Sequence, residues 1–178
     1  PAGMATLTEH GIDAGKAYDT PEELIRAGGF DLLMIGSPNH MHLDHIRLGL
    51  EAGVRVFSEK PIVASIEQSY ALAGLLGRHG HDRLSVGLVL RYAPLYRDLL
   101  KARDEGLLGQ IVSVEAAEHI YPYHGAFFMR DWRRYEKWSG SFMLEKCCHD
   151  LDLYNGLIGA RPERVASFGG RKTLLIRA

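Results

Sequence analysis

The sequence predicts an α/β protein whose N-terminal half contains a parallel sheet of the doubly wound type. Three short apolar runs, at about 31–36, 54–57 and 84–90, have the length and composition of buried strands. Helical segments at about 42–52 and 65–78 lie between them. Strands and helices that alternate in this order build a doubly wound parallel sheet.

A helix over about 21–27 is expected before the first strand. Thr20 has the hydroxyl of an N-cap, Pro21 suits the first turn, and Gly28 ends the segment. The strand that follows, at 31–36, is a continuous apolar run, so we expect both of its faces to be covered.

The two helices between the strands have end signals and apolar faces. The helix at 42–52 ends before Gly53, and Ser65 caps the helix that runs to about Arg78. The residues expected to pack inward are Leu43, Ile46 and Leu50 in the first helix and Leu72, Leu75 and Leu76 in the second.

The pattern changes after Arg91, where a second unit is expected to begin. We therefore divide the chain into residues 1–91 and 92–178. The elements predicted for the second unit are helices from Pro94 to about Glu105 and from about Phe142 to Ile158, strands over 110–120 and 163–169, and an irregular stretch over 121–141.

Composition and charge exclude several classes of protein. Of the 178 residues 46% are hydrophobic and 24% are charged, and the net charge is −1, so neither nucleic acid nor a membrane surface is an expected partner. No apolar run approaches the roughly 20 residues of a membrane span, and Pro1–Gly11 lacks the pattern of a signal peptide.

The sequence has two cysteines, Cys147 and Cys148, which are adjacent and therefore poorly placed to pair with each other. This favours a reducing compartment, the cytoplasm.

Polar groups follow two neighbouring strands of the predicted sheet. Ser37-Pro38-Asn39-His40 comes after the first strand and Glu59-Lys60-Pro61 after the second. Parallel strands bring their carboxyl ends to one edge, where ligands bind in open α/β sheets. Pro61 restricts Lys60 to extended geometry, and the lysine amine can donate to a substrate hydroxyl or carbonyl oxygen. The alternatives are a surface lysine before a turn and, for the first segment, a turn followed by an Asn cap.

A second group of candidate residues lies on the predicted helix 142–158. Glu145 and His149 are four residues apart and so share a helix face, which Asp152 extends. A histidine beside a packed face can act as a general base near neutral pH, oriented by a carboxylate. The alternative is an ordinary Glu–His pair on a helix surface.

Three nearby histidines, His40, His42 and His45, raise the question of a metal. His42 and His45 could share a helix face, but no matching set of further ligands is evident in the sequence, so no metal site is predicted. The Cys147-Cys148 pair is expected to serve packing rather than redox chemistry. No pattern of nucleic-acid recognition stands out.

These motifs in this spacing resemble the glucose–fructose oxidoreductase / inositol dehydrogenase (Gfo/Idh/MocA) family of NAD(P)-dependent enzymes. The resemblance covers about residues 8–170. The segments that carry it are Ser37–His42, Leu50–Gly53, Ser58–Pro61, Val86–Arg91, Pro94, Glu105–Ile111, Asp131–Arg133 and Ser139–Asp150.

The resemblance implies a fold and an activity. It implies a partial Rossmann-like, NAD(P)-binding domain over 1–91, followed over 92–178 by part of an α+β domain with a mainly antiparallel sheet for substrate binding and oligomerisation. The implied reaction is hydride transfer between NAD or NADP and a CH–OH group of a small-molecule sugar, inositol or related polyol. A homo-oligomer is the family expectation for the full-length form.

The resemblance also implies roles for single residues. Lys60 belongs to the family's Glu-Lys-Pro signature, often with a cis Lys-Pro bond, and would assist proton removal from the substrate. His149 would match the catalytic histidine, and Glu145 stands where the family commonly has Asp. The implied cofactor contacts are Ser37, Pro38, Asn39, His40, Glu59, Lys60, Pro61, Arg91, Trp132 and Arg133.

The sequence also departs from the family pattern. It contains no G-x-G-x-x-G loop that opens a helix, and the family's second domain is longer. We therefore expect the middle of such an enzyme, with weak or no NAD(P)H binding by these 178 residues alone and an exposed sheet edge at 31–36. A catalytically inactive ligand-binding or scaffold protein with the same fold is the alternative.

Overall fold

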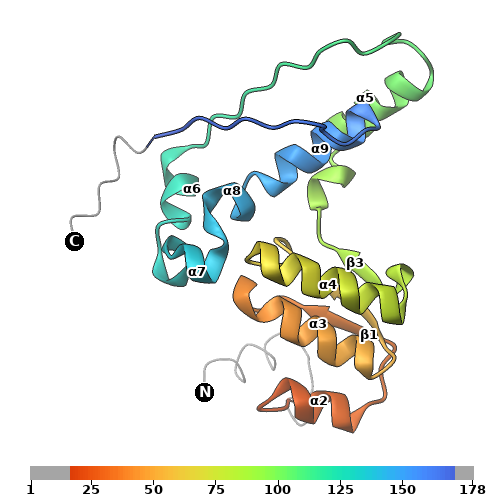
Figure 1. Cartoon of the computed structure of the whole chain (residues 1–178), viewed down its shortest axis with the longest axis vertical. Coiled ribbons are helices and arrows are strands. Elements are labelled where there is room, and N and C mark those ends of the chain that lie inside the picture. Colours follow the sequence, from red (N-terminus) through yellow and green to blue (C-terminus); the bar gives the residue numbers. More distant parts are fainter. Residues whose placement is uncertain (1–16, 171–178) are drawn as a thin grey trace.

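A parallel sheet of three strands organises the N-terminal half of the computed structural model, which describes residues 17–170 (Figure 1). The strands β1 (Leu32–Ile35), β2 (Arg55–Ser58) and β3 (Leu84–Val86) lie in the order β1-β2-β3. Both pairings are parallel. The α/β prediction is confirmed, and the segments that follow β1 and β2 begin at the same edge of the sheet.

Three helices belong to this half of the chain: α2 (Pro21–Ala27), α3 (His42–Glu51) and α4 (Ile66–His79). They lie close to their expected positions. The hydroxyl oxygens of Thr20 and Ser65 accept hydrogen bonds from main-chain N–H groups three residues later, at 3.2 and 3.3 Å. Both predicted N-caps are therefore confirmed.

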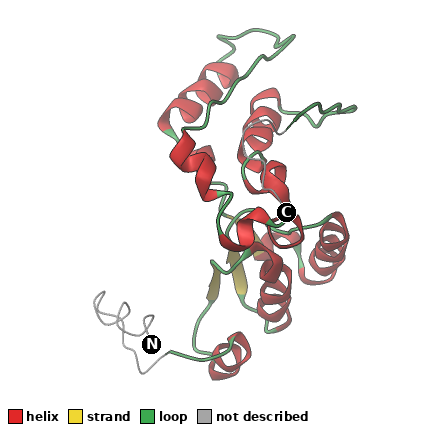
Figure 2. Ribbon diagram, turned by 90° about the vertical axis from the view of Figure 1, so that its left-hand side faces the viewer, coloured by secondary structure: helices red, strands yellow, loops and turns green. Residues whose placement is uncertain are grey.

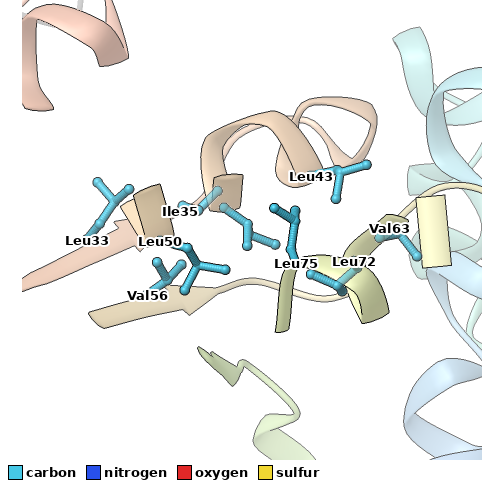
Figure 3. Packing of buried hydrophobic residues seen from close by; sticks show 9 residues of the cluster. Leu33, Ile35, Leu43, Leu50, Val56, Val63, Leu72 and Leu75 are labelled. Atoms are coloured by element: carbon cyan, nitrogen blue, oxygen red, sulfur yellow. The ribbon is translucent and has the colours of Figure 1, made fainter. Parts of the chain in front are cut away.

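Aliphatic side chains fill the space between α3, α4 and the sheet (Figure 3). Ile46 of α3 is 0% exposed and Val56 of β2 is 1% exposed. The other buried members of this core are Leu33, Ile35, Leu43, Leu50, Val63, Leu72 and Leu75, and Leu76 packs at its margin. The inward faces predicted for both helices are confirmed.

β1 is covered on one face, so the expectation of two covered faces is wrong for the described residues. Leu33 and Ile35 belong to the core, whereas Leu32 is 49% and Met34 is 69% exposed. In the lower part of Figure 2 the helices lie on one side of the strands. An apolar run indicates a strand, but it does not show whether helices cover one face of that strand or both.

The C-terminal half is mostly helical. The helices are α5 (Pro94–Asp104), α6 (Pro122–Phe127), α7 (Glu136–Ser139), α8 (Ser141–Glu145) and α9 (Cys148–Ile158). α5 is confirmed, and it lies beside α9 (Figure 1). No helix between residues 17 and 170 is long and apolar enough to cross a membrane.

Two helix predictions for this half are corrected. The stretch 121–141, expected to be irregular, contains α6, α7 and the short 3-10 helix Asp131–Arg134. The helix expected over 142–158 is interrupted at Lys146-Cys147, between α8 and α9. Two short helices in series keep nearly the same apolar spacing as one long helix, so the pattern did not reveal the interruption.

The strands predicted over 110–120 and 163–169 are not formed in the described part of the chain. Both segments lack ladder pairing there, and the mainly antiparallel sheet implied by the resemblance is therefore not seen in residues 17–170. Val112 is 91% and Phe168 is 95% exposed. Apolar alternation shows that a segment suits a strand, but a strand exists only where a partner completes its hydrogen bonds.

Candidate active site

A cavity of about 210 Å³ opens where the segments after β1 and β2 meet the C-terminal half of the chain. It is bounded by the 3-10 helix Asp131–Arg134 and by the end of α8. The predicted site residues that line it are Ser37, Asn39, Glu59, Lys60, Trp132, Arg133 and Glu145. Parts of four separate predicted motifs therefore converge on one place.

Lys60 reaches from the end of β2 to the end of α8. Its Nζ donates a hydrogen bond of 2.8 Å to the main-chain oxygen of Glu145 and lies 3.9 Å from Oε1 of the same residue. The Lys60-Pro61 peptide bond is cis, as the resemblance implied. The side chain of Lys60 is 20% exposed, so the amine faces the cavity from a largely desolvated position.

Glu145 is buried at 5% exposure, and two side chains hold its carboxylate. Lys60 is one of them. Asn39 is the other, since its Nδ2 donates to Oε2 of Glu145 and, at 3.0 Å, to the main-chain oxygen of Ser139. The amide group of Asn39 is therefore used to fix a carboxylate.

His149 lies in the first turn of α9 and is 8% exposed. Its Nδ1 is buried and has no hydrogen-bond partner within residues 17–170. Burial lowers the pKa of His149 below 6.5, and the positive charges of Lys60 and Lys146 lower it further. The neutral imidazole, which can accept a proton, is therefore favoured.

The expected shared helix face of Glu145 and His149 is not found, because the interruption at Lys146-Cys147 places them in separate helices. His149 does not line the cavity that holds Lys60. It is nevertheless close enough to Lys60 for that charge to act on its pKa. Glu145 and His149 therefore both lie near Lys60, but from two different helices.

Trp132 and Arg133 present a stacked surface to the cavity. The guanidinium carbon of Arg133 lies 4.5 Å from the ring centre of Trp132 and 4.2 Å from that of Phe127. Contact with two aromatic faces holds the guanidinium plane in place. Phe127 also lines the cavity, and sequence reasoning missed it because it lies in the stretch expected to be irregular.

The remaining predicted contacts lie around the cavity rather than in its lining. The ring of His40 packs against Trp138, with centres 4.4 Å apart, and meets the edge of Trp132 at 6.2 Å. Pro38 and Pro61 border the loops but do not line the cavity. These residues lie behind the side chains that line the cavity.

Arg91 is not brought to the cavity. Its Nε donates a hydrogen bond of 2.6 Å to Asp152 of α9, and this bond raises the pKa of Arg91. The side chain of Arg91 is 58% exposed. Arg91 joins the segment after β3 to α9, and Asp152, three residues after His149 in the same helix, is occupied by this ion pair.

The three histidines considered for a metal have separate partners. His42 places each ring nitrogen 2.8 Å from a main-chain carbonyl oxygen, and Nδ1 of His45 lies 3.0 Å from Oγ of Ser37. His40 packs against aromatic rings. Across residues 17–170 no three His, Cys, Asp or Glu side chains are grouped to hold a metal ion.

Two family models match the chain. The model described as an oxidoreductase family with an NAD-binding Rossmann fold matches residues 6–88. The model described as the C-terminal alpha/beta domain of the oxidoreductase family matches residues 101–175. Together they extend over most of the sequence.

Curated relatives and solved structures agree with this match. The scyllo-inositol 2-dehydrogenase (NAD(+)) of Bacillus subtilis (strain 168) is 29% identical over 171 residues, which cover 94% of this chain and 46% of the relative. The structure of apo scyllo-inositol dehydrogenase from Lactobacillus casei superposes with a TM-score of 0.70 and 26% identity, over 89% of this chain and 45% of that one.

The structure of scyllo-inositol dehydrogenase from Lactobacillus casei with bound NAD(H) and scyllo-inositol is similar as well. Its TM-score is 0.63 at 26% identity, and it covers 79% of this chain and 41% of that one. The chain thus spans less than half the length of these relatives. The matched domains, the parallel sheet and the Glu-Lys-Pro segment beside the cavity show that the chain belongs to the Gfo/Idh/MocA oxidoreductase family.

Proposed function

We propose that the native protein is an NAD(P)-dependent oxidoreductase that moves a hydride between the nicotinamide and a CH–OH carbon of a sugar, inositol or related polyol. One observation carries the proposal. The amine of Lys60 and the carboxylate of Glu145, 85 positions apart in the sequence, meet in a cavity at the carboxyl edge of a parallel sheet. That edge is where open α/β sheets bind ligands.

Alcohol oxidation breaks a C–H bond and an O–H bond and forms a C=O bond. Bound NAD or NADP supplies the hydride acceptor. In this proposal His149 takes the hydroxyl proton, and Lys60 donates a hydrogen bond to the oxygen as negative charge develops. Glu145 orients Lys60. The lowered pKa of His149 and the contacts of Lys60 with Glu145 support these roles.

The cavity lining suits the nicotinamide and ribose end of the cofactor. Ser37 and Glu59 offer a hydroxyl and a carboxylate that can bond to ribose hydroxyls, and Trp132 and Arg133 offer flat surfaces for stacking. We assign these four residues to direct contact. Pro38, Asn39, His40 and Pro61 are assigned to the supporting wall, and Arg91 to the junction with α9.

Further parts of the proposal concern the organisation of the protein. We propose a cofactor unit within residues 1–91 and a substrate and oligomerisation unit beginning at 92. Cytoplasmic location is proposed because Cys147 and Cys148, the cysteines of the sequence, are free thiols.

The test is an assay of the native protein with NAD⁺ or NADP⁺ and a panel of inositols and sugars, followed by absorbance of the reduced nicotinamide. Lys60→Ala should lower kcat by about 10²–10⁴-fold, because the developing charge on the oxygen loses its donor. Lys101→Ala is the matched control, since the Lys101 side chain is 72% exposed and pairs with Glu105 on the surface of α5.

Equal turnover by Lys60→Ala and the control would contradict the assignment of Lys60. Cofactor binding without turnover of any alcohol in the panel would instead support the alternative of an inactive ligand-binding protein.

A further inference from the structure

His42 joins the two loops that carry the candidate site, at a point where the sheet has stopped holding them together. The β1–β2 ladder ends with Ile35 opposite Ser58, and one further bond of 2.9 Å runs from the Glu59 N–H to the Ile35 oxygen. Within residues 17–170 no further main-chain hydrogen bond joins the two loops. The His42 side chain lies between them and is 1% exposed.

Both ring nitrogens of His42 face hydrogen-bond acceptors. Nδ1 lies 2.8 Å from the main-chain oxygen of Pro61, and Nε2 lies 2.8 Å from the main-chain oxygen of Ser37. A carbonyl oxygen has no proton to donate, and a neutral imidazole has a single N–H group. Both contacts are hydrogen bonds only if both nitrogens carry a proton.

We propose that His42 is a protonated positioning residue, an imidazolium that clamps the Lys60-Pro61 segment to the Ser37 segment. Two charge-assisted hydrogen bonds compensate for the burial of the charge. Fixing the Pro61 carbonyl fixes the main chain directly after Lys60, and so fixes the direction from which Nζ reaches Glu145. The importance of this clamp for turnover rests on the proposed function, whereas its protonation does not.

The charged surroundings of His42 contain both signs. The groups that face it, or lie beside it, are Asp44 and His45 on α3, Glu59 and Lys60 after β2, Arg133 in the 3-10 helix and Glu145 at the end of α8. Two of the carboxylates, on Glu59 and Glu145, line the same cavity as His42.

The first test is spectroscopic. In the whole chain labelled with ¹⁵N at histidine, long-range ¹H–¹⁵N correlation distinguishes protonated from unprotonated ring nitrogens, and through-bond correlation to the backbone assigns His42. We expect both His42 nitrogens to be protonated at neutral pH. One unprotonated nitrogen would overturn the proposal, whatever the protein catalyses.

The second test separates positioning from overall stability. In His42→Gln the side-chain amide can donate to one carbonyl but presents its oxygen to the other, so one contact of the clamp is lost. We expect kcat to fall by about 10²-fold through displacement of Lys60, with the cofactor KM nearly unchanged. His81→Gln, on an exposed residue of the 3-10 helix His81–Arg83, is the control.

Unchanged kcat in a folded His42→Gln protein would remove the positioning role. If the wild-type protein turns over no substrate, the proposed function fails while the spectrum still decides the protonation state. If His42→Gln does not fold, the wild-type spectrum alone decides whether the clamp exists.

Discussion

Glu145 is the buried charge around which the candidate site is organised. Its side chain is 6% exposed, and its charge is met by the amine of Lys60 and the amide of Asn39. A buried carboxylate without such partners would be costly, because it gives up its hydration. The site therefore depends on the two donors as much as on the carboxylate that they hold.

Two substitutions at Glu145 distinguish the effect of its charge from the effect of its size. Glu145→Gln keeps the size but leaves Lys60 without its counter-charge, so we expect the free energy of unfolding to fall by about 1–3 kcal/mol and kcat to fall as well. Glu145→Asp keeps the charge and is one methylene shorter, so it should retain more activity. Chemical denaturation and steady-state kinetics measure both effects. A Gln variant that is as active as Glu145→Asp would show that the charge is not needed.

The lowered pKa of His149 makes stability depend on pH. The unfolded chain binds a proton near pH 6.5, whereas the folded protein resists protonation at this position until the pH is lower. The contribution of His149 to the free energy of unfolding is thus fully present above pH 6.5. It is lost as the pH falls from 6.5 toward the pKa of His149 in the folded protein.

Denaturation curves at several pH values below 6.5 test this dependence. His149→Gln cannot be protonated, so its unfolding free energy should fall less steeply with acid than that of the wild type. An identical slope in both proteins would mean that His149 titrates alike in the folded and unfolded states. The lowered pKa of His45 contributes a slope of the same sign, which remains in the variant.

At the scale of elements, the contact between α3 and β2 depends on one glycine. A Cβ atom at Gly49 would lie 2.7 Å from Cγ2 of Val56 and 3.0 Å from Cδ2 of Leu33. The helix therefore approaches the sheet more closely than any larger residue at this position would allow. Gly77, in α4, has no such neighbour within 4 Å.

Alanine at these two glycines should have opposite effects. Gly49→Ala overpacks the core, and we expect the free energy of unfolding to fall by about 1–3 kcal/mol, with a lower Tm. Gly77→Ala adds helix propensity at an exposed site and should raise the free energy of unfolding by roughly 0.5–1 kcal/mol. Thermal and chemical unfolding of both variants provide the comparison. A stabilised Gly49→Ala would show that α3 can move away from the sheet without loss.

The elements also show what can be predicted from sequence. α2, α3 and α4 have local signals, such as the Thr20 and Ser65 caps, and these were read correctly. The stretch 110–120 carries an equally clear alternation, yet strand formation depends on a partner elsewhere. Lys146, at the break before α9, forms ion pairs with Glu118 at 2.6 Å and with Asp150 at 3.4 Å. The Glu118 contact comes from 28 residues away and leaves no local pattern.

The same limit applies to the candidate site. Lys60 and Glu145 were each singled out, but their direct hydrogen bond was not predicted, because it joins residues 85 positions apart. Arg91 was expected at the cofactor but pairs with Asp152, because the fold of α9 decides which carboxylate it reaches. His42 was considered only as a metal ligand. Its two carbonyl partners come from the main chain, which sequence motifs do not reveal.

At the scale of the whole molecule, the candidate site is also a joint between the two halves of the described chain. Asn39 and Lys60, which follow strands of the sheet, bond to Ser139 and Glu145 in the helices of the second half. The Arg91–Asp152 pair is a further connection, but it is more exposed. The geometry of the candidate site and the docking of the second half therefore depend on the same few contacts.

Asn39→Ala tests this double role. It leaves the Ser139 carbonyl and the Glu145 carboxylate each short of a donor, so we expect the free energy of unfolding to fall by about 1–3 kcal/mol. Because these acceptors lie just before α8 and at its end, amide hydrogen exchange in α8 should become faster, whereas exchange in the core of α3 should change little.

Asn155→Ala, at an exposed residue of α9, is the matched control. Faster exchange in α3 and α8 alike would indicate global destabilisation, and unchanged exchange in α8 would show that the Asn39 contacts are not needed to hold α8 in place.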